Sequence, residues 1–201
     1  MRTRAIVVSL GLLAALTACT TNSPAAEPAP TAAPTPTATI TFAPVTVPTD
    51  CVTLVDENTY ATVFAETPLN DPGLGYAETL GAVSPTAPAA DAGVDDVVDA
   101  ATQLRCVWRF PEADITYLQV CIGSVAAAVG DDYRAALQLD GYTCDDTLEG
   151  TRCAVTGIDP QYQTDTADTV FLRDDLVIRI DQANFPTNDL LGAIVAQIWA
   201  A

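Results

Sequence analysis

A tract of thirty residues, 20–49, sets the strongest limit on how this chain can fold. It consists almost entirely of threonine, alanine and proline, with seven prolines and no regular apolar period. Such a composition cannot bury a hydrophobic core, and it favours an extended polyproline II conformation. At ~3.1 Å per residue the tract would reach roughly 90 Å when extended. We therefore expect a spacer here and a single globular domain in residues 50–201.

The N-terminus carries the pattern of a secretory signal. Arg2 and Arg4 precede an apolar run over residues 5–16, which is too short to span a bilayer comfortably. Small residues then lead into a cysteine, in the sequence Leu-Thr-Ala-Cys that ends at Cys19. This stretch resembles the lipobox of bacterial lipoprotein signal peptides.

The lipobox resemblance implies a lipid-anchored protein. Residues 1–18 would be a signal peptide that is removed, and Cys19 would carry the lipid, including palmitate. Residues 19–49 would then link the anchor to the domain on the extracytoplasmic face of the cell membrane. The partner implied by this arrangement is the membrane, through the lipid on Cys19.

The charge of the chain is strongly acidic. It holds 26 acidic and 8 basic residues, for a formal net charge of −18, and removal of the leader with its two arginines would leave −20. Such a surface repels nucleic-acid phosphates and anionic lipid headgroups, so nucleic acid is not an expected partner. We interpret the acidity as a means of keeping an exported domain soluble.

Two residue types are missing altogether. The chain has no histidine and no lysine, since all eight basic residues are arginine. The absence of histidine excludes Ser-His-Asp and Cys-His catalysis and histidine-ligated metal sites. The absence of lysine excludes Schiff-base chemistry, Ser-Lys hydrolysis and the Walker phosphate loop. We expect no catalytic, cofactor-binding or metal-binding residues and no cofactor.

Cysteine usage agrees with export, where cysteines usually pair. Cys144 and Cys153 flank a turn between two extended segments, so a disulfide is expected there. The second expected disulfide joins Cys51 to Cys106, which leaves Cys121 as a buried free thiol. Pairing of Cys106 with Cys121 across a hairpin is the alternative.

Hydrophobic periodicity predicts helices and strands along the domain. Asp56 is expected to cap a helix that runs to about residue 65, and Thr187 to cap an amphipathic helix that closes the chain. Further helices are expected over 94–104 and 131–139. Residues 68–88 are expected to form a loop with one short strand near 80–83. The predicted strands are 104–110, 115–123, 151–157, 169–173 and 176–180.

Strands and helices in this order predict an α+β fold. We expect an antiparallel sheet of about five strands with helices packed on one face, completed by the C-terminal amphipathic helix. Hairpins are expected between the first two strands and between the last two, the latter around Asp174 and Asp175.

Three short motifs carry a second resemblance. Cys51-x-x-Leu54 precedes the first helix, Leu104-Arg-Cys106-x-Trp108 lies on a predicted core strand, and an amphipathic helix ends the chain. Together they are similar to the small, mostly uncharacterised cell-envelope lipoproteins of actinobacteria. The resemblance implies an α+β domain on the cell surface and no activity that transfers to this chain.

The remaining candidates for chemistry are acidic or aromatic. Glycoside hydrolysis needs two carboxylates about 5–10 Å apart across a cleft, whereas adjacent aspartates at turns and helix starts stay solvated. The segment 145–150 has the wrong spacing for a calcium loop. Trp108 and Trp199 fall on buried faces, so we expect core packing and not a ligand pocket. The adjacent aspartates, for which we expect structural roles, are Asp131–Asp132, Asp145–Asp146 and Asp174–Asp175.

These observations favour a monomeric, non-enzymatic surface domain that acts as a binding or accessory module of the cell envelope. Its partner would be an envelope protein or a hydrophobic ligand held between sheet and helices. The alternative is a hydrolase of envelope glycans that uses paired aspartates, which requires a buried carboxylate pair in a cleft.

Overall fold

The computed structural model describes residues 45–64, 66–113 and 115–199. The chain divides into two units, 1–40 and 41–201, and the described residues all belong to the second. The predicted leader and the lipidation site Cys19 therefore lie outside the described residues.

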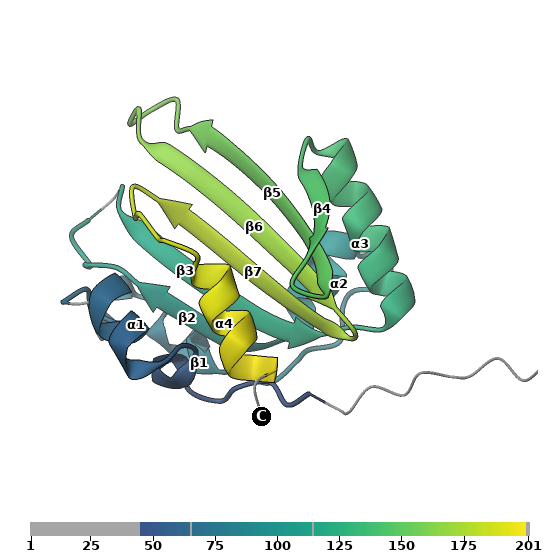
Figure 1. Cartoon of the computed structure of the whole chain (residues 1–201), viewed down its shortest axis with the longest axis horizontal. Helices are drawn as coiled ribbons and strands as arrows, with labels where there is room; N and C mark the ends of the chain where they lie inside the picture. Colours follow the sequence, from purple (N-terminus) through teal and green to yellow (C-terminus); the bar gives the residue numbers. More distant parts are fainter. Residues whose placement is uncertain (1–44, 65, 114, 200–201) are drawn as a thin grey trace, which may run out of the picture. The chain divides into compact units, whose positions relative to one another are not determined.

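The described residues form an α+β fold (Figure 1). Short 3-10 turns, η1 to η3, precede the first strand at Cys51–Thr53, Pro72–Leu74 and Ala77–Thr79. The helices are α1 (Glu57–Val63), α2 (Val94–Ala100), α3 (Ala127–Leu139) and α4 (Leu190–Trp199). The strands are β1 (Gly81–Ala82), β2 (Thr102–Trp108), β3 (Tyr117–Ser124), β4 (Thr143–Thr147), β5 (Gly150–Ile158), β6 (Asp165–Arg173) and β7 (Leu176–Ala183).

All seven strands form one antiparallel sheet in the order β1-β2-β3-β7-β6-β5-β4. The chain first builds β1 to β3, crosses to the opposite edge through α3, and returns strand by strand until β7 pairs with β3. Both predicted hairpins are present, β2 with β3 and β6 with β7.

The expected number of about five strands is wrong, because two edge strands carry weak sequence signals. β4 has the sequence Thr-Cys-Asp-Asp-Thr, whose polar side chains lack the apolar alternation of a core strand. The pairing with β5 and the Cys144–Cys153 disulfide nevertheless hold it in the sheet. β1 has only two residues and lies within the expected short strand near 80–83.

Helices cover both faces of the sheet, so the expectation that they pack on one face is also wrong. On one face, here called the α4 face, side chains of β3, β6 and β7 such as Val120, Phe171 and Ile178 pack with η1 and α4. On the other, the α3 face, Val170 and Val177 pack with α2 and α3. The central strands carry apolar side chains on alternating sides, and each side must be covered (Figure 1).

Two helix starts differ from the prediction. α3 begins four residues before position 131, after the extended residue Ala126, so its aspartates lie in the second turn. α4 begins at Leu190, and the Thr187 hydroxyl donates to Gln182 Oε1 at 3.0 Å without capping the helix. Asp56 does cap α1, because its carboxylate accepts a hydrogen bond from the Thr59 N–H.

Both predicted disulfides are present, Cys51–Cys106 and Cys144–Cys153, and Cys121 is a buried free cysteine. The alternative bridge between Cys106 and Cys121 is excluded by register. Cys121 lies opposite Arg105, one position away from Cys106, so the two side chains point to opposite faces of the sheet.

Trp108 packs in the core, as predicted, with no exposed surface. Its ring stacks on Phe64 with centroids 4.1 Å apart, and Tyr60 of α1 lies edge-on at 6.5 Å. Trp199 is partly buried and packs edge-on against Phe171, with the Arg173 guanidinium 4.7 Å from its ring centroid.

Candidate functional site

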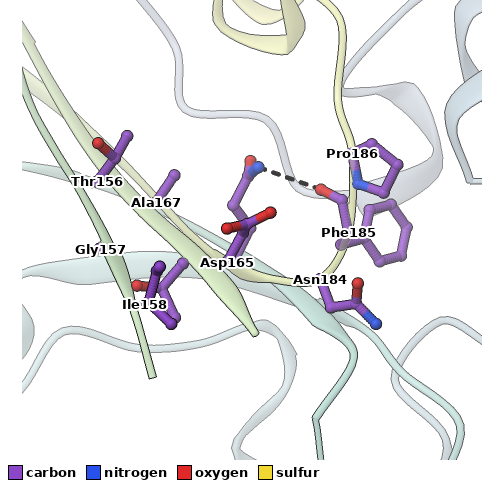
Figure 2. Close-up of a pocket in the computed structure, with 10 residues that line it drawn as sticks. Thr156, Gly157, Ile158, Asp165, Ala167, Asn184, Phe185 and Pro186 are labelled. Atoms are coloured by element: carbon purple, nitrogen blue, oxygen red, sulfur yellow. Dashed lines mark hydrogen bonds between the residues drawn. The ribbon is translucent and has the colours of Figure 1, made fainter. Parts of the chain in front are cut away.

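An open groove lies on the α4 face, at the end of the sheet where β5 finishes and β6 begins. Its volume is about 650 Å³, within the range of about 300–1,000 Å³ typical of small-molecule sites. Figure 2 shows side chains of β5 and β6 on one side and the segment after β7 on the other. The groove is lined by Thr156, Gly157, Ile158, Asp165, Thr166, Ala167, Gln182, Asn184, Phe185 and Pro186.

The groove exists because β5 and β6 extend beyond the part of the sheet that α4 covers (Figure 1). Ile158, the last residue of β5, keeps 63% of its surface exposed. Two small residues, Gly157 and Ala167, also line the groove on this side. Apolar side chains at a strand end that no helix covers indicate a surface suited to contact with another apolar group.

The opposite wall is held by hydrogen bonds from the sheet. Gln182, near the end of β7, donates from Nε2 to the Phe185 carbonyl at 3.1 Å (Figure 2). Its Oε1 accepts from the Thr187 hydroxyl. Phe185 is also anchored in the core, with 8% of its surface exposed. The wall formed by Phe185 and Pro186 is therefore fixed relative to β7.

A second, polar cavity lies on the α3 face, behind β6 and β7. Its volume is about 230 Å³. Asp168 of β6 and Asp181 of β7 lie directly opposite each other in the strand register and both line this cavity. The Tyr117 hydroxyl donates to Asp181 Oδ1 at 2.8 Å, and the Tyr142 hydroxyl lies 3.5 Å from Asp168 Oδ2.

Burial and charge shift the titration of these groups in the same direction. Partial burial, and then the negative charge of Asp181, raise the pKa of Asp168 to about 6. Burial and the neighbouring Asp168 raise the pKa of Tyr142 to about 12. Burial, followed by the hydrogen bond to Asp181, raises the pKa of Tyr117. The Asp168 carboxyl group therefore changes its protonation in mildly acidic solution, while both tyrosines stay neutral there.

A third cluster joins α2 to the sheet. Asp99 Oδ1 lies 2.7 Å from Arg179 Nη2 and 3.0 Å from Arg105 Nη2, so one carboxylate bridges β7 and β2. Arg179 also donates to the Thr102 hydroxyl at 3.0 Å. Burial would raise the pKa of Asp99, but the hydrogen bonds from the two arginines outweigh it and hold that pKa below its ordinary value. Beneath this bridge, burial raises the pKa of the Cys121 thiol.

Of the three adjacent aspartate pairs singled out in the sequence, two come together: Asp131, Asp174 and Asp175 line one open cavity of about 170 Å³, which Asp145 and Asp146 do not line. All six residues are solvent-exposed: Asp131 and Asp132 lie in α3, Asp145 and Asp146 in β4, and Asp174 and Asp175 in the turn between β6 and β7. Asp131 pairs with Arg134, Asp145 pairs with Arg152, and Asp175 accepts from the Ser124 hydroxyl.

Sequence reasoning missed the pair that the fold does bring together. Asp168 and Asp181 are thirteen residues apart in the chain, and only the β6–β7 register shows that they face each other. A signal was present, since each is an acidic residue in the interior of a predominantly apolar or threonine-containing strand. A carboxylate within a core strand is uncommon unless it has a partner.

Two general properties of the described residues limit the kinds of site. Among residues 45–199 that the structure describes, no three histidine, cysteine or acidic side chains gather as a metal site would require. No helix in this part of the chain is both long and apolar enough to cross a membrane.

Comparison with known proteins gave no match. Neither a protein-family model, nor a curated protein, nor a solved structure is significantly similar to this chain.

Proposed function

We propose that this chain is a cell-envelope lipoprotein whose folded domain binds a small apolar ligand in the groove on the α4 face. In this proposal Cys19 carries the lipid, the proline-rich tract acts as the spacer, and the domain works as a monomer outside the cytoplasm. The observation that carries the proposal is the groove of about 650 Å³ between Ile158 and Phe185.

The composition of the lining favours binding over catalysis. Half of the ten lining residues are apolar or glycine, and Asp165 is the one ionisable side chain among them. General acid–base hydrolysis needs two positioned groups that exchange a proton with the substrate. Ligand binding needs apolar area and a few fixed polar groups, which Gln182 and the two threonines supply.

The alternative, an envelope-glycan hydrolase, would depend on Asp168 and Asp181. They are directly opposed residues of neighbouring strands, whose Cβ atoms lie about 5 Å apart, so the two carboxyl groups can contact each other. Retaining glycosidases separate their carboxyl groups by about 5 Å and inverting ones by more, to leave room for the sugar or a water molecule. This contact supports the binding function over the hydrolase.

A dye-binding experiment tests the proposal. Nile red, an uncharged apolar dye, should bind the domain with a fluorescence increase. Ala167→Phe places a ring in the groove and should weaken this binding at least tenfold. The matched control is Ala135→Phe, at an exposed position of α3, which should bind as the unaltered domain does.

Circular dichroism and thermal unfolding establish that both variants are folded before binding is compared. Equal dye affinity for the Ala167→Phe and Ala135→Phe variants would show that the groove is not the binding site.

A further inference from the structure

The floor of the groove and the carboxyl pair lie on the same two stretches of backbone. Ala167 of β6 faces Gln182 of β7, and the next pair along the strands is Asp168 and Asp181. Because side chains alternate, the first pair lines the groove on the α4 face and the second lines the polar cavity on the α3 face. A change in the spacing of the strands at one pair therefore reaches the other.

We propose that Asp168 and Asp181 form a proton-operated switch that alters the groove on the opposite face of the sheet. The regulatory role rests on the proposed ligand-binding function of the groove. The physical coupling between the carboxyl pair and the floor of the groove is independent of that function, so it can be measured without a ligand.

The register brings the two carboxyl groups as close as a sheet allows. β6 and β7 are joined by the two-residue turn Asp174–Asp175, and Arg173 faces Leu176 across it. Hydrogen-bonded and non-hydrogen-bonded pairs alternate from that closing pair, which puts Asp168 and Asp181 in a non-hydrogen-bonded pair. Side chains approach most closely in such pairs, and like charges there repel each other.

One shared proton removes this repulsion. When Asp168 is protonated, its carboxyl group donates a hydrogen bond to the ionised Asp181, and the strands stay close. When that proton leaves to solvent, two negative charges face each other across the strands. Partial burial is the largest cause of the raised pKa of Asp168, and the preference for the singly protonated pair raises it further.

The groups around the pair allow it to change state. The Tyr117 hydroxyl donates to Asp181 Oδ1 at 2.8 Å. The Tyr142 hydroxyl lies 3.5 Å from Asp168 Oδ2, where it can donate a stronger hydrogen bond once Asp168 is ionised. Arg179, two residues from Asp181, is engaged by Asp99 and Thr102. The other groups that face or influence the pair are Tyr133 of α3, Arg109 after β2, the neutral Gln119 of β3 and Val155 of β5.

Ionisation then acts on the groove through one residue. As Asp168 turns toward Tyr142, β6 and β7 lose their side-chain link at this pair. Gln182, the neighbour of Asp181, supplies the hydrogen bond that holds Phe185 in the groove wall. We expect the groove to be well formed below pH 6 and loosened above it.

Nuclear magnetic resonance tests the coupling in the ligand-free domain. The carboxyl carbon of Asp168 and the backbone amides of Ala167 and Gln182 are followed from pH 4.5 to 8. In the unaltered domain both sets should titrate with a common midpoint near 6. In Asp168→Asn, whose amide donates to Asp181 at every pH, the groove amides should lose this transition.

Asp132→Asn, which removes an exposed carboxylate from α3, is the matched control and should keep the transition. The switch is overturned if the groove amides do not follow the carboxyl titration, or if they move equally in the Asp168→Asn domain.

Nile red affinity then tests the regulatory role. The unaltered domain should bind the dye at least threefold more tightly at pH 5.0 than at pH 7.5. The Asp168→Asn domain should bind the dye with the same affinity at both pH values. The same pH dependence in both proteins would overturn the role while leaving the groove as a binding site. Failure to bind the dye at either pH would reject the groove function itself, and the amide titration would still decide the coupling.

Discussion

At the scale of single residues, two aspartates on the α3 face affect stability in opposite directions. Asp99 is held by two arginines, so folding favours its ionised form. Asp168 is partly buried and faces another carboxylate, so folding favours its protonated form. The stability of the domain should therefore depend on pH in two distinct ranges.

The Asp168→Asn variant tests the second of these effects. Because the folded-state pKa is raised from 3.8 to about 6, this group stabilises the fold in acid and the benefit is lost as pH rises through 6. The unaltered domain should lose about 1 kcal/mol of unfolding free energy between pH 4.5 and 7.5, after allowance for solvent screening of a half-exposed group. Urea unfolding should show no such loss in the variant, and an equal loss in both would contradict this account.

The Asp99→Asn variant should behave in the opposite way. It leaves two arginines without their shared carboxylate, which we expect to cost about 1 kcal/mol at pH 7, since Asp99 itself is largely exposed. The pKa of Asp99 is lowered, so its contribution is present above its ordinary range and disappears as pH falls. Urea unfolding curves of variant and unaltered protein should converge as the pH falls below the ordinary range of an aspartate. A difference in unfolding free energy between the two proteins that persists in acid would mean that the charge of Asp99 does not cause it.

At the scale of elements, the two disulfides stabilise segments that packing holds unequally. Cys51–Cys106 closes a loop with a sequence separation of 55, whereas Cys144–Cys153 closes one of 9 and staples the polar edge strand β4. In the chain-entropy model these loops correspond to about 4 and about 3 kcal/mol.

Paired cysteine-to-alanine variants test this order. Removal of Cys51 and Cys106 should lower the unfolding free energy more than removal of Cys144 and Cys153, because the larger loop regains more freedom in the unfolded chain. In the variant that lacks Cys144 and Cys153, hydrogen exchange should show that the loss of amide protection is concentrated in β4. Uniform loss of protection across the sheet in the Cys144 and Cys153 variant would contradict a local role for that bridge.

Elements with a strong local pattern were predictable from the sequence. The α1 cap at Asp56, the β6–β7 hairpin and the Cys144–Cys153 disulfide follow from short-range signals, whereas the Cys51–Cys106 disulfide joins residues with a sequence separation of 55 and had an open alternative in the sequence. The strand β4 was not predictable in this way, because its polar residues are ordered by pairing and a bridge and not by burial. Coverage of both sheet faces was missed because a strand with polar residues at alternate positions, as Arg179 and Asp181 are in β7, resembles a strand with one solvent face.

The candidate sites were harder to predict than the fold. The groove depends on how far α4 extends across the sheet, and the pairing of Asp168 with Asp181 depends on exact register between two strands. Both are long-range consequences of assembly, which no local spacing of residues encodes.

At the scale of the whole molecule, the proposal joins a binding domain to a membrane anchor. Cys19→Ala should shift the protein from the membrane fraction to the soluble fraction, because lipidation requires that cysteine. The domain itself should unfold at the same temperature in both forms, since the described fold begins at residue 45, well after position 19. A Cys19→Ala protein that still sediments with membranes would contradict the anchor.

The central claim is that the domain holds an apolar small molecule in the groove beside Ala167 and Phe185. Native mass spectrometry of the domain released from envelope membranes tests this most directly, by comparison with its denatured mass. We predict extra mass that is lost on denaturation and is absent from the Ala167→Phe variant. A domain that shows only its own mass, or extra mass that Ala167→Phe leaves unchanged, would contradict the claim.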